Sequence, residues 1–161
     1  MLLCTGTCAC GPTESDHVLD VTYSPCALVI DVDSSAAPDE VQSIDTAIVL
    51  WNEAGGFGLT RDAKETFPRL RVQFEKALSS FRGVYDDERG VVIINERLDD
   101  PRALALTVAH ELGHAFGLWH VASSSRTSLM NPGVVTVEPT PEDVNEVRAI
   151  WGSCGFTPES N

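Results

Sequence analysis

The 161-residue sequence contains no apolar run that approaches the roughly 20 residues needed to span a bilayer, which excludes a transmembrane segment. Basic residues are also scarce, since 11 Lys and Arg stand against 24 Asp and Glu, for a formal net charge of −13. Because a field of this sign repels phosphate backbones, nucleic acid is excluded as a partner. The charge favours solubility, and an attraction for cationic peptides is the alternative interpretation.

Internal repeats, low-complexity blocks and a second domain boundary are absent too. The length and the 43% apolar content fit one domain with its own core, and we expect a monomer. Residues 1–17 are expected to be an irregular N-terminal segment or the remnant of a signal peptide, and residues 18–161 a single domain. A complete signal peptide would have a basic start and an apolar run of about 7–15 residues, and the sequence shows neither.

The five cysteines are unevenly placed. Three crowd the start, and a lipid anchor on Cys8 or Cys10 is one interpretation of them. Cys26 and Cys154 then remain as a pair that an exported protein could join, the alternative being two unrelated buried thiols. We therefore expect an extracytoplasmic protein, whether secreted, periplasmic or lipid-anchored.

Apolar periodicity and turn residues predict an α+β domain. Strands are expected at residues 18–23, 27–32, 70–74, 81–85 and 90–95, of which 81–85 is a short edge strand and 90–95 is buried on both faces. Helices are expected from Pro38 to the Gly55-Gly56 pair, from Pro101 towards Gly117, and from Pro141 to Gly152. Asp99 or Asp100 caps the second helix, and Thr140 caps the third.

The second of these helices carries the chemistry, because residues 110–120 read His-Glu-Leu-Gly-His-Ala-Phe-Gly-Leu-Trp-His. His110 and His114 are four residues apart and project from one helix face, so both can reach one Zn²⁺ at about 2.0–2.1 Å. Glu111 points off the ligand direction and can hydrogen-bond a metal-bound water. Gly117 allows a backbone turn that brings His120 round as the third ligand.

Three protein ligands leave a fourth position for water, which is the arrangement of a catalytic zinc site. Glu111 would take the proton as water attacks a peptide carbonyl and return it to the leaving amine. The one histidine outside the motif is His17, and no competing Ser/His/Asp or Cys/His set is found. The prediction is a zinc-dependent endopeptidase with one catalytic ion and a peptide or protein substrate. The alternatives are a catalytically silent zinc- or peptide-binding module of the same fold and a zinc-stabilised structural domain.

The extended motif resembles the signature of the metzincin clan of zinc peptidases, His-Glu-x-x-His-x-x-Gly-x-x-His followed by a methionine turn. Residues 128–132, Ser-Leu-Met-Asn-Pro, are similar to that turn, which implies that Met130 lies beneath the three histidines. Among metzincins the matrixins are most similar, through residues 47–51 and 140–152. The resemblance implies a metzincin-like zinc protease domain: a twisted mixed β-sheet with a backing helix, an active-site helix and a C-terminal helix.

The chain departs from that family in several places. Val121 follows His120 where matrixins usually have Ser, and no tyrosine follows the motif to serve as an extra ligand. The loop 75–89 contains no histidine, so a second, structural zinc is not expected. The acidic residues 86–88 could bind Ca²⁺ through oxygen ligands, although a solvated turn explains them more simply. No cysteine-switch pattern is visible.

The resemblance also implies an extended peptide lying along an exposed strand edge above the zinc. The pocket wall would come from residues 133–139, where Val134, Val135 and Val137 make it apolar. That composition predicts a hydrophobic side chain just after the scissile bond. The alternative is that these valines pack into the core.

Overall fold

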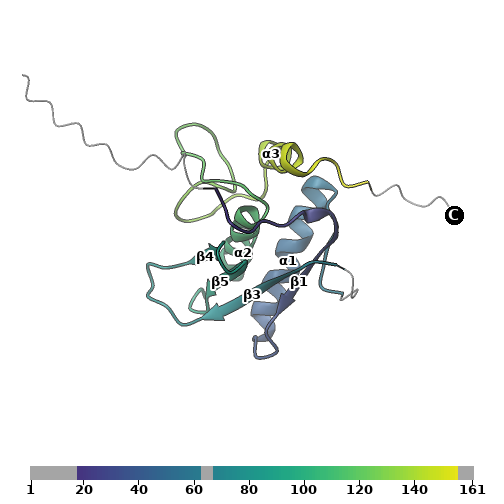
Figure 1. The fold of residues 1–161 in the computed structure, drawn as a ribbon. Helices are drawn as coiled ribbons and strands as arrows, with labels where there is room; N and C mark the ends of the chain where they lie inside the picture. The colour runs from purple at the N-terminus through teal and green to yellow at the C-terminus, as the bar shows by residue number, and fades with distance from the viewer. Residues whose placement is uncertain (1–17, 63–66, 156–161) are drawn as a thin grey trace, which may run out of the picture.

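The computed structural model describes residues 18–62 and 67–155. The expected signal-peptide remnant and its three cysteines lie outside these residues. The helices are the short 3₁₀ helix η2 (Pro25–Ala27), α1 (Pro38–Gly55), α2 (Pro101–Ala115) and α3 (Pro141–Trp151). The strands are β1 (Leu28–Val32), β2 (Leu59–Thr60), β3 (Arg69–Glu75), β4 (Gly83–Asp86) and β5 (Val91–Asn95) (Figure 1).

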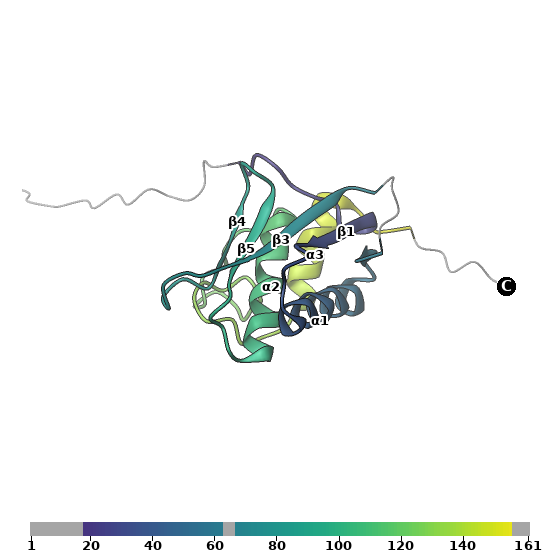
Figure 2. The same cartoon turned by 90° about the horizontal axis from the view of Figure 1, so that it is seen from below.

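The strands form one mixed sheet in the order β2-β1-β3-β5-β4. The first four run parallel, and β4 pairs antiparallel with β5 at the edge. In β3, Leu70 and Val72 are buried while Arg69 and Arg71 are exposed, so one face of the sheet turns towards the core. Figure 2 shows the helices gathered on that side. The expected mixed sheet with a backing helix, an active-site helix and a C-terminal helix is confirmed.

Helix α1 is the backing helix. Pro38 opens it, Glu40 accepts a hydrogen bond from the Ala37 N–H at 2.7 Å, and Gly56 ends it at a φ of 62°. Its buried Trp51 donates from Nε1 to the Ala109 carbonyl at 2.9 Å. This bond joins α1 to α2 at the residue before His110. Helix α1 therefore helps to position the part of α2 that carries His110.

Helix α2 begins and ends as its sequence requires. Asp100 is the cap, because its Oδ1 accepts from the Ala103 N–H at 2.6 Å. Beyond Ala115 the chain reverses, and Gly117 takes a φ of 100° that other residues resist. At α3, Thr140 and Asp143 form a capping box.

Three expectations about strands need correction. Residues 18–23 are not a strand: the Tyr23 N–H donates to the Ala115 carbonyl at 2.8 Å, so a helix end takes the place of a neighbouring strand. The two-residue strand β2 was not expected, since it is too short to show a period. Strand β5 is not buried on both faces, because Val92 and Ile94 are buried while Val91 and Ile93 are half-buried.

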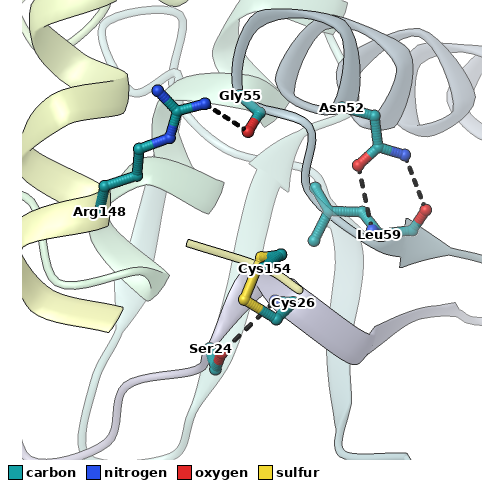
Figure 3. Close-up of a disulfide and its surroundings, with 7 residues drawn as sticks. All are labelled: Ser24, Cys26, Asn52, Gly55, Leu59, Arg148 and Cys154. Carbon is teal, nitrogen blue, oxygen red and sulfur yellow. Dashed lines mark hydrogen bonds between the residues drawn. A yellow bond between two sulfur atoms is a disulfide. The ribbon is translucent and has the colours of Figure 1, made fainter. Parts of the chain in front are cut away.

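A disulfide joins Cys26 and Cys154, which are 128 residues apart in the sequence and 5.0 Å apart at Cα. It ties η2, just before β1, to the segment that follows α3 (Figure 3). Beside it, Arg148 of α3 donates to the Gly55 carbonyl at 3.0 Å. The structure therefore shows the two cysteines joined, and they are not unrelated buried thiols. Within the described residues, no helix is both long and apolar enough to cross a membrane.

Candidate metal centre

Three histidine side chains converge above α2. His110 and His114 project from one face of the helix, and the turn at Gly117 returns His120 to them. The Nε2 atom of His120 lies 3.2 Å from Nε2 of His110 and 3.2 Å from Nε2 of His114. Tetrahedral zinc with N–Zn bonds of about 2.0–2.1 Å holds its nitrogen ligands roughly 3.3 Å apart. The spacing of the three nitrogens therefore fits one zinc ion.

The other ring nitrogens fix the protonation of this group. His110 Nδ1 lies 2.7 Å from the Leu129 carbonyl, and His114 Nδ1 lies 2.8 Å from the Leu118 carbonyl. Because a carbonyl only accepts, each Nδ1 carries the hydrogen and each Nε2 presents a lone pair. A neutral His120 can donate to at most one of these lone pairs. The remaining contact brings two lone pairs together, an arrangement that a bound cation stabilises.

Burial favours the neutral form of His110 and His114. It lowers the pKa of His110, and it lowers the pKa of His114 to about 3, with the nearness of His110 acting in the same direction. Neutral imidazole is the form that binds metal. At pH 7 these two side chains can therefore bind zinc without first losing a proton.

Glu111 lies next to the three histidines and is only 5% exposed. Burial raises its pKa to about 8, and a hydrogen bond with the backbone of Tyr85 acts in the opposite direction. A divalent cation at the histidines would favour the carboxylate form. The approach of β4 leaves little room, since a Cβ on Gly83 would lie 3.0 Å from Glu111 Oε1.

Met130 is fully buried. Its sulfur lies against α2 where that helix has Gly113, because a Cβ at Gly113 would lie 2.5 Å from Met130 Sδ. The Met130 carbonyl accepts from the Val121 N–H at 2.9 Å, which ties the turn to the residue after His120. The methionine turn thus contacts the segments that carry all three histidines.

Asp143 of α3 binds this turn through hydrogen bonds. Its buried carboxylate accepts hydrogen bonds from the Leu129 N–H at 2.9 Å, from Arg126 at 2.8 Å and from the Ser128 hydroxyl. Burial alone would raise the pKa of Asp143, but these bonds together with the one from the Thr140 N–H lower it. Leu129 is also the residue whose carbonyl meets His110. The sequence indicated Asp143 only as a capping residue, and nothing in its local pattern shows these longer-range bonds.

Two cavities flank Glu111. We call the first, of about 270 Å³, the Trp119 cavity; its wall includes Leu19, Tyr85, Asp87, His114 and Trp119. The second, of about 240 Å³, is the Val135 cavity, lined by Phe81, Thr107, His110, Gly133 and Val135 among others. Gly83, Glu111 and His120 line both, so the metal centre lies where they meet.

The structure separates the three valines of the expected pocket wall. Val135 lines the Val135 cavity and also belongs to the core, so both interpretations of it hold. Val134 is 67% exposed, and Val137 is half-buried. Sequence reasoning missed Leu19, Tyr85 and Trp119, because a wall built from three distant segments has no local signature.

The acidic turn 86–88 shows other contacts. Asp86 pairs with Arg89 at 3.4 Å, and Asp87 Oδ2 accepts from the Asp20 N–H at 3.1 Å. Among the described residues, the three histidines form the one group of three or more His, Cys, Asp or Glu placed to hold a metal. Ca²⁺ at this turn therefore gains no support.

The fold, the three-histidine centre and the methionine turn together resemble a metzincin-like metalloprotease domain of the matrixin type. No family model matches the chain. Hatching enzyme of Paracentrotus lividus is 27% identical over 155 residues, covering 83% of this chain and 25% of that protein. Matrix metalloproteinase-27 is 38% identical over 61 residues in Tupaia belangeri and 41% over 54 residues in Homo sapiens. These two matches cover 35% and 30% of this chain and 12% and 10% of the relatives, so the chain spans a quarter of their length or less.

Proposed function

We propose that this domain is a zinc-dependent endopeptidase that holds one catalytic Zn²⁺ through His110, His114 and His120. The observation that carries the proposal is the convergence of three Nε2 atoms at zinc-ligand spacing beside a buried glutamate. The similarity to matrix metalloproteinase-27 supports the same class of reaction.

Zinc, when bound, supplies a Lewis acid that polarises a carbonyl and lowers the pKa of a water towards roughly 7. The chain supplies the proton transfers. Glu111 takes the proton of the attacking water and gives it to the departing amine, so the carboxylate ends the cycle as it began. The closeness of Tyr85 and Gly83 keeps this side chain in place. No nucleophilic side chain is needed.

The substrate would lie along β4. This strand is the edge of the sheet, so one side of its backbone can pair with an extended peptide. Such a peptide would pass Glu111 and place side chains in the cavities on either side. The apolar Val135 fits a hydrophobic side chain just after the scissile bond, with Val134 and Val137 in the outer part of the same wall.

Met130 and Gly117 act as supports of the site, the first from beneath and the second through its turn. We further propose that residues 18–161 form a single catalytic domain, that it is monomeric, and that it works outside the cytoplasm. The disulfide supports an oxidising compartment. A lipid anchor at Cys8 or Cys10 is one form that export could take.

The competing function is a zinc- or peptide-binding module without turnover. The presence of Glu111 argues against it, because this side chain has no role in holding the metal. A zinc-stabilised structural domain is opposed by the ligand count, since structural zinc sites are almost always closed by four protein ligands.

Digestion of a diverse peptide mixture by zinc-loaded protein tests the proposal, with cleavage sites identified by mass spectrometry. We expect internal cleavage that stops when the metal is chelated and resumes when zinc is returned. Binding of one zinc ion without any cleavage would favour the binding module. Removal of terminal residues alone would make the enzyme an exopeptidase.

A further inference from the structure

The Trp119 cavity has an unusual wall for a site that holds a dication. Trp119 lies between the ligands His114 and His120 in the sequence and keeps 40% of its surface exposed. Asp87 lines the same cavity, and none of the described residues that line it is Lys or Arg. Trp119 and Asp87 therefore line the same cavity.

The Asp87 side is held in place by other parts of the fold. Its Oδ2 accepts from the Asp20 N–H at 3.1 Å, and the hydroxyl of neighbouring Tyr85 donates to the Val21 carbonyl at 2.7 Å. These two bonds hold the N-terminal segment across the cavity, where Leu19 and Val84 add apolar surface. The carboxylate is thus oriented before any ligand arrives.

We propose that the Trp119 cavity is a subsite for a basic side chain, Lys or Arg, of the substrate. The apolar stem of such a side chain packs on Leu19 and Val84. Its cationic group gains a charge-assisted hydrogen bond from Asp87 and a cation–π contact with Trp119. The net charge of −13 also favours cationic peptides, because it raises their local concentration near the protein.

The subsite rests on the proposed endopeptidase function. If the Val135 cavity accepts the side chain after the scissile bond, the Trp119 cavity accepts one before it. A dication at the histidines repels a second cation, so the basic group belongs at the Asp87 side of the cavity. Without a carboxylate there, the cavity would favour a purely apolar side chain, which is the competing outcome.

The test uses peptides that differ at one position, scanned across the cleavage site, with arginine, its neutral near-isostere citrulline, or leucine. Wild-type protein is compared with Asp87→Asn, which keeps an acceptor for the Asp20 N–H but loses the charge. Glu88→Gln is the matched control, because this neighbour is exposed and does not line the cavity. Zinc content is measured for every variant.

At one position before the scissile bond we expect arginine to exceed citrulline about tenfold in kcat/KM, the size of a charge-assisted hydrogen bond. Asp87→Asn should lower this ratio to about two- to fivefold, the part that the cation–π contact with Trp119 still provides, while Glu88→Gln leaves it unchanged. Trp119→Leu, with zinc still bound, should lower the ratio about two- to fivefold through the lost cation–π contact. Equal cleavage of arginine and citrulline peptides by wild-type protein, or a leucine preference, would overturn the proposal.

Binding to zinc-loaded Glu111→Gln separates this inference from the function on which it rests. Labelled arginine and citrulline peptides are titrated, and fluorescence anisotropy gives each affinity without turnover. Tighter arginine binding that Asp87→Asn reduces would support the subsite even if the wild type cleaved nothing, and the endopeptidase proposal alone would fail. Cleavage by the wild type with no such difference in binding would contradict the subsite proposal and leave the endopeptidase proposal intact.

Discussion

Asp143 links α3 to the metal centre through hydrogen bonds that pass by way of Leu129. Its carboxylate accepts a hydrogen bond from the Leu129 N–H, and the Leu129 carbonyl accepts one from Nδ1 of His110. The carboxylate is completely buried, and its partners are Arg126 and donors from the methionine turn and the start of α3. A buried charge of this kind stabilises a fold only while its partners are complete.

Replacing Asp143 with Asn keeps the shape but presents an amide to these donors. We expect the free energy of unfolding at pH 7 to fall by about 2–4 kcal/mol, measured by urea denaturation. The pKa of Asp143 is lowered in the folded protein, so its carboxylate stabilises the fold above the unfolded value of about 3.9. This contribution is lost as the pH falls through the lower folded value. The gap between wild type and variant should therefore narrow below about pH 4; a constant gap would contradict this role.

Gly113 is the residue that lets the methionine turn approach α2. In an ordinary helix interior, Gly→Ala stabilises by about 0.5–1 kcal/mol. At Gly113 the new methyl group would meet the sulfur of Met130, so we expect the opposite sign. Gly113→Ala should lower the free energy of unfolding by about 1–3 kcal/mol and weaken zinc binding, as measured by thermal denaturation and by competition with a chelator. Gly155→Ala, where a Cβ meets nothing within 4 Å, is the control. Equal effects of the two substitutions would show that this contact is unimportant.

Among the elements, α2 matters most because it carries His110, Glu111 and His114. Its cap can be changed far from the site. Asp100→Ala should lower the free energy of unfolding by about 1 kcal/mol, because the Ala103 N–H loses its acceptor, while kcat/KM stays unchanged. Asp99→Ala is the matched control and should cost less than about 0.5 kcal/mol. The sequence could not choose between these neighbours, and a larger effect at Asp99 would contradict the observed cap.

The helices could be predicted because their signals are local. Pro38, Pro101 and Pro141 mark the starts, and Gly56 and Gly152 mark the ends at positive φ. Strands depend on partners that the local pattern does not show. Residues 18–23 have strand composition but bind the end of α2, and β2 owes its existence to pairing with β1.

The residues of the site likewise fall into those that a local motif predicts and those that it does not. The spacing of the motif predicted that His110, His114 and His120 would meet, and the structure brings them together. The cavity walls were largely missed, since Leu19, Tyr85 and Trp119 come from an irregular segment, a strand and a turn. Such neighbours are set by the packing of whole elements, which no short motif encodes.

At the scale of the whole molecule, the disulfide closes nearly the entire described chain into one loop. With a sequence separation of 128 between its cysteines, the chain-entropy account gives a contribution of about 4–5 kcal/mol, and measured losses usually lie at about 2–5 kcal/mol. The double variant Cys26→Ser, Cys154→Ser should lose stability by this order in urea denaturation, while zinc binding is retained in the folded protein. Peptide mapping before and after reduction provides the check. Recovery of both cysteines as free thiols in unreduced exported protein would contradict the bond.

We expect Glu111 to perform the proton transfers of a peptide hydrolysis that depends on three histidine ligands. The most direct measurement compares kcat/KM of zinc-loaded wild type and Glu111→Gln on one cleaved peptide, with the zinc content of each determined alongside. Because Glu111 is not one of the three proposed ligands, we expect one zinc ion per chain in both proteins and a loss of about 10²- to 10⁴-fold in kcat/KM for the variant. Undiminished hydrolysis by zinc-loaded Glu111→Gln would contradict it.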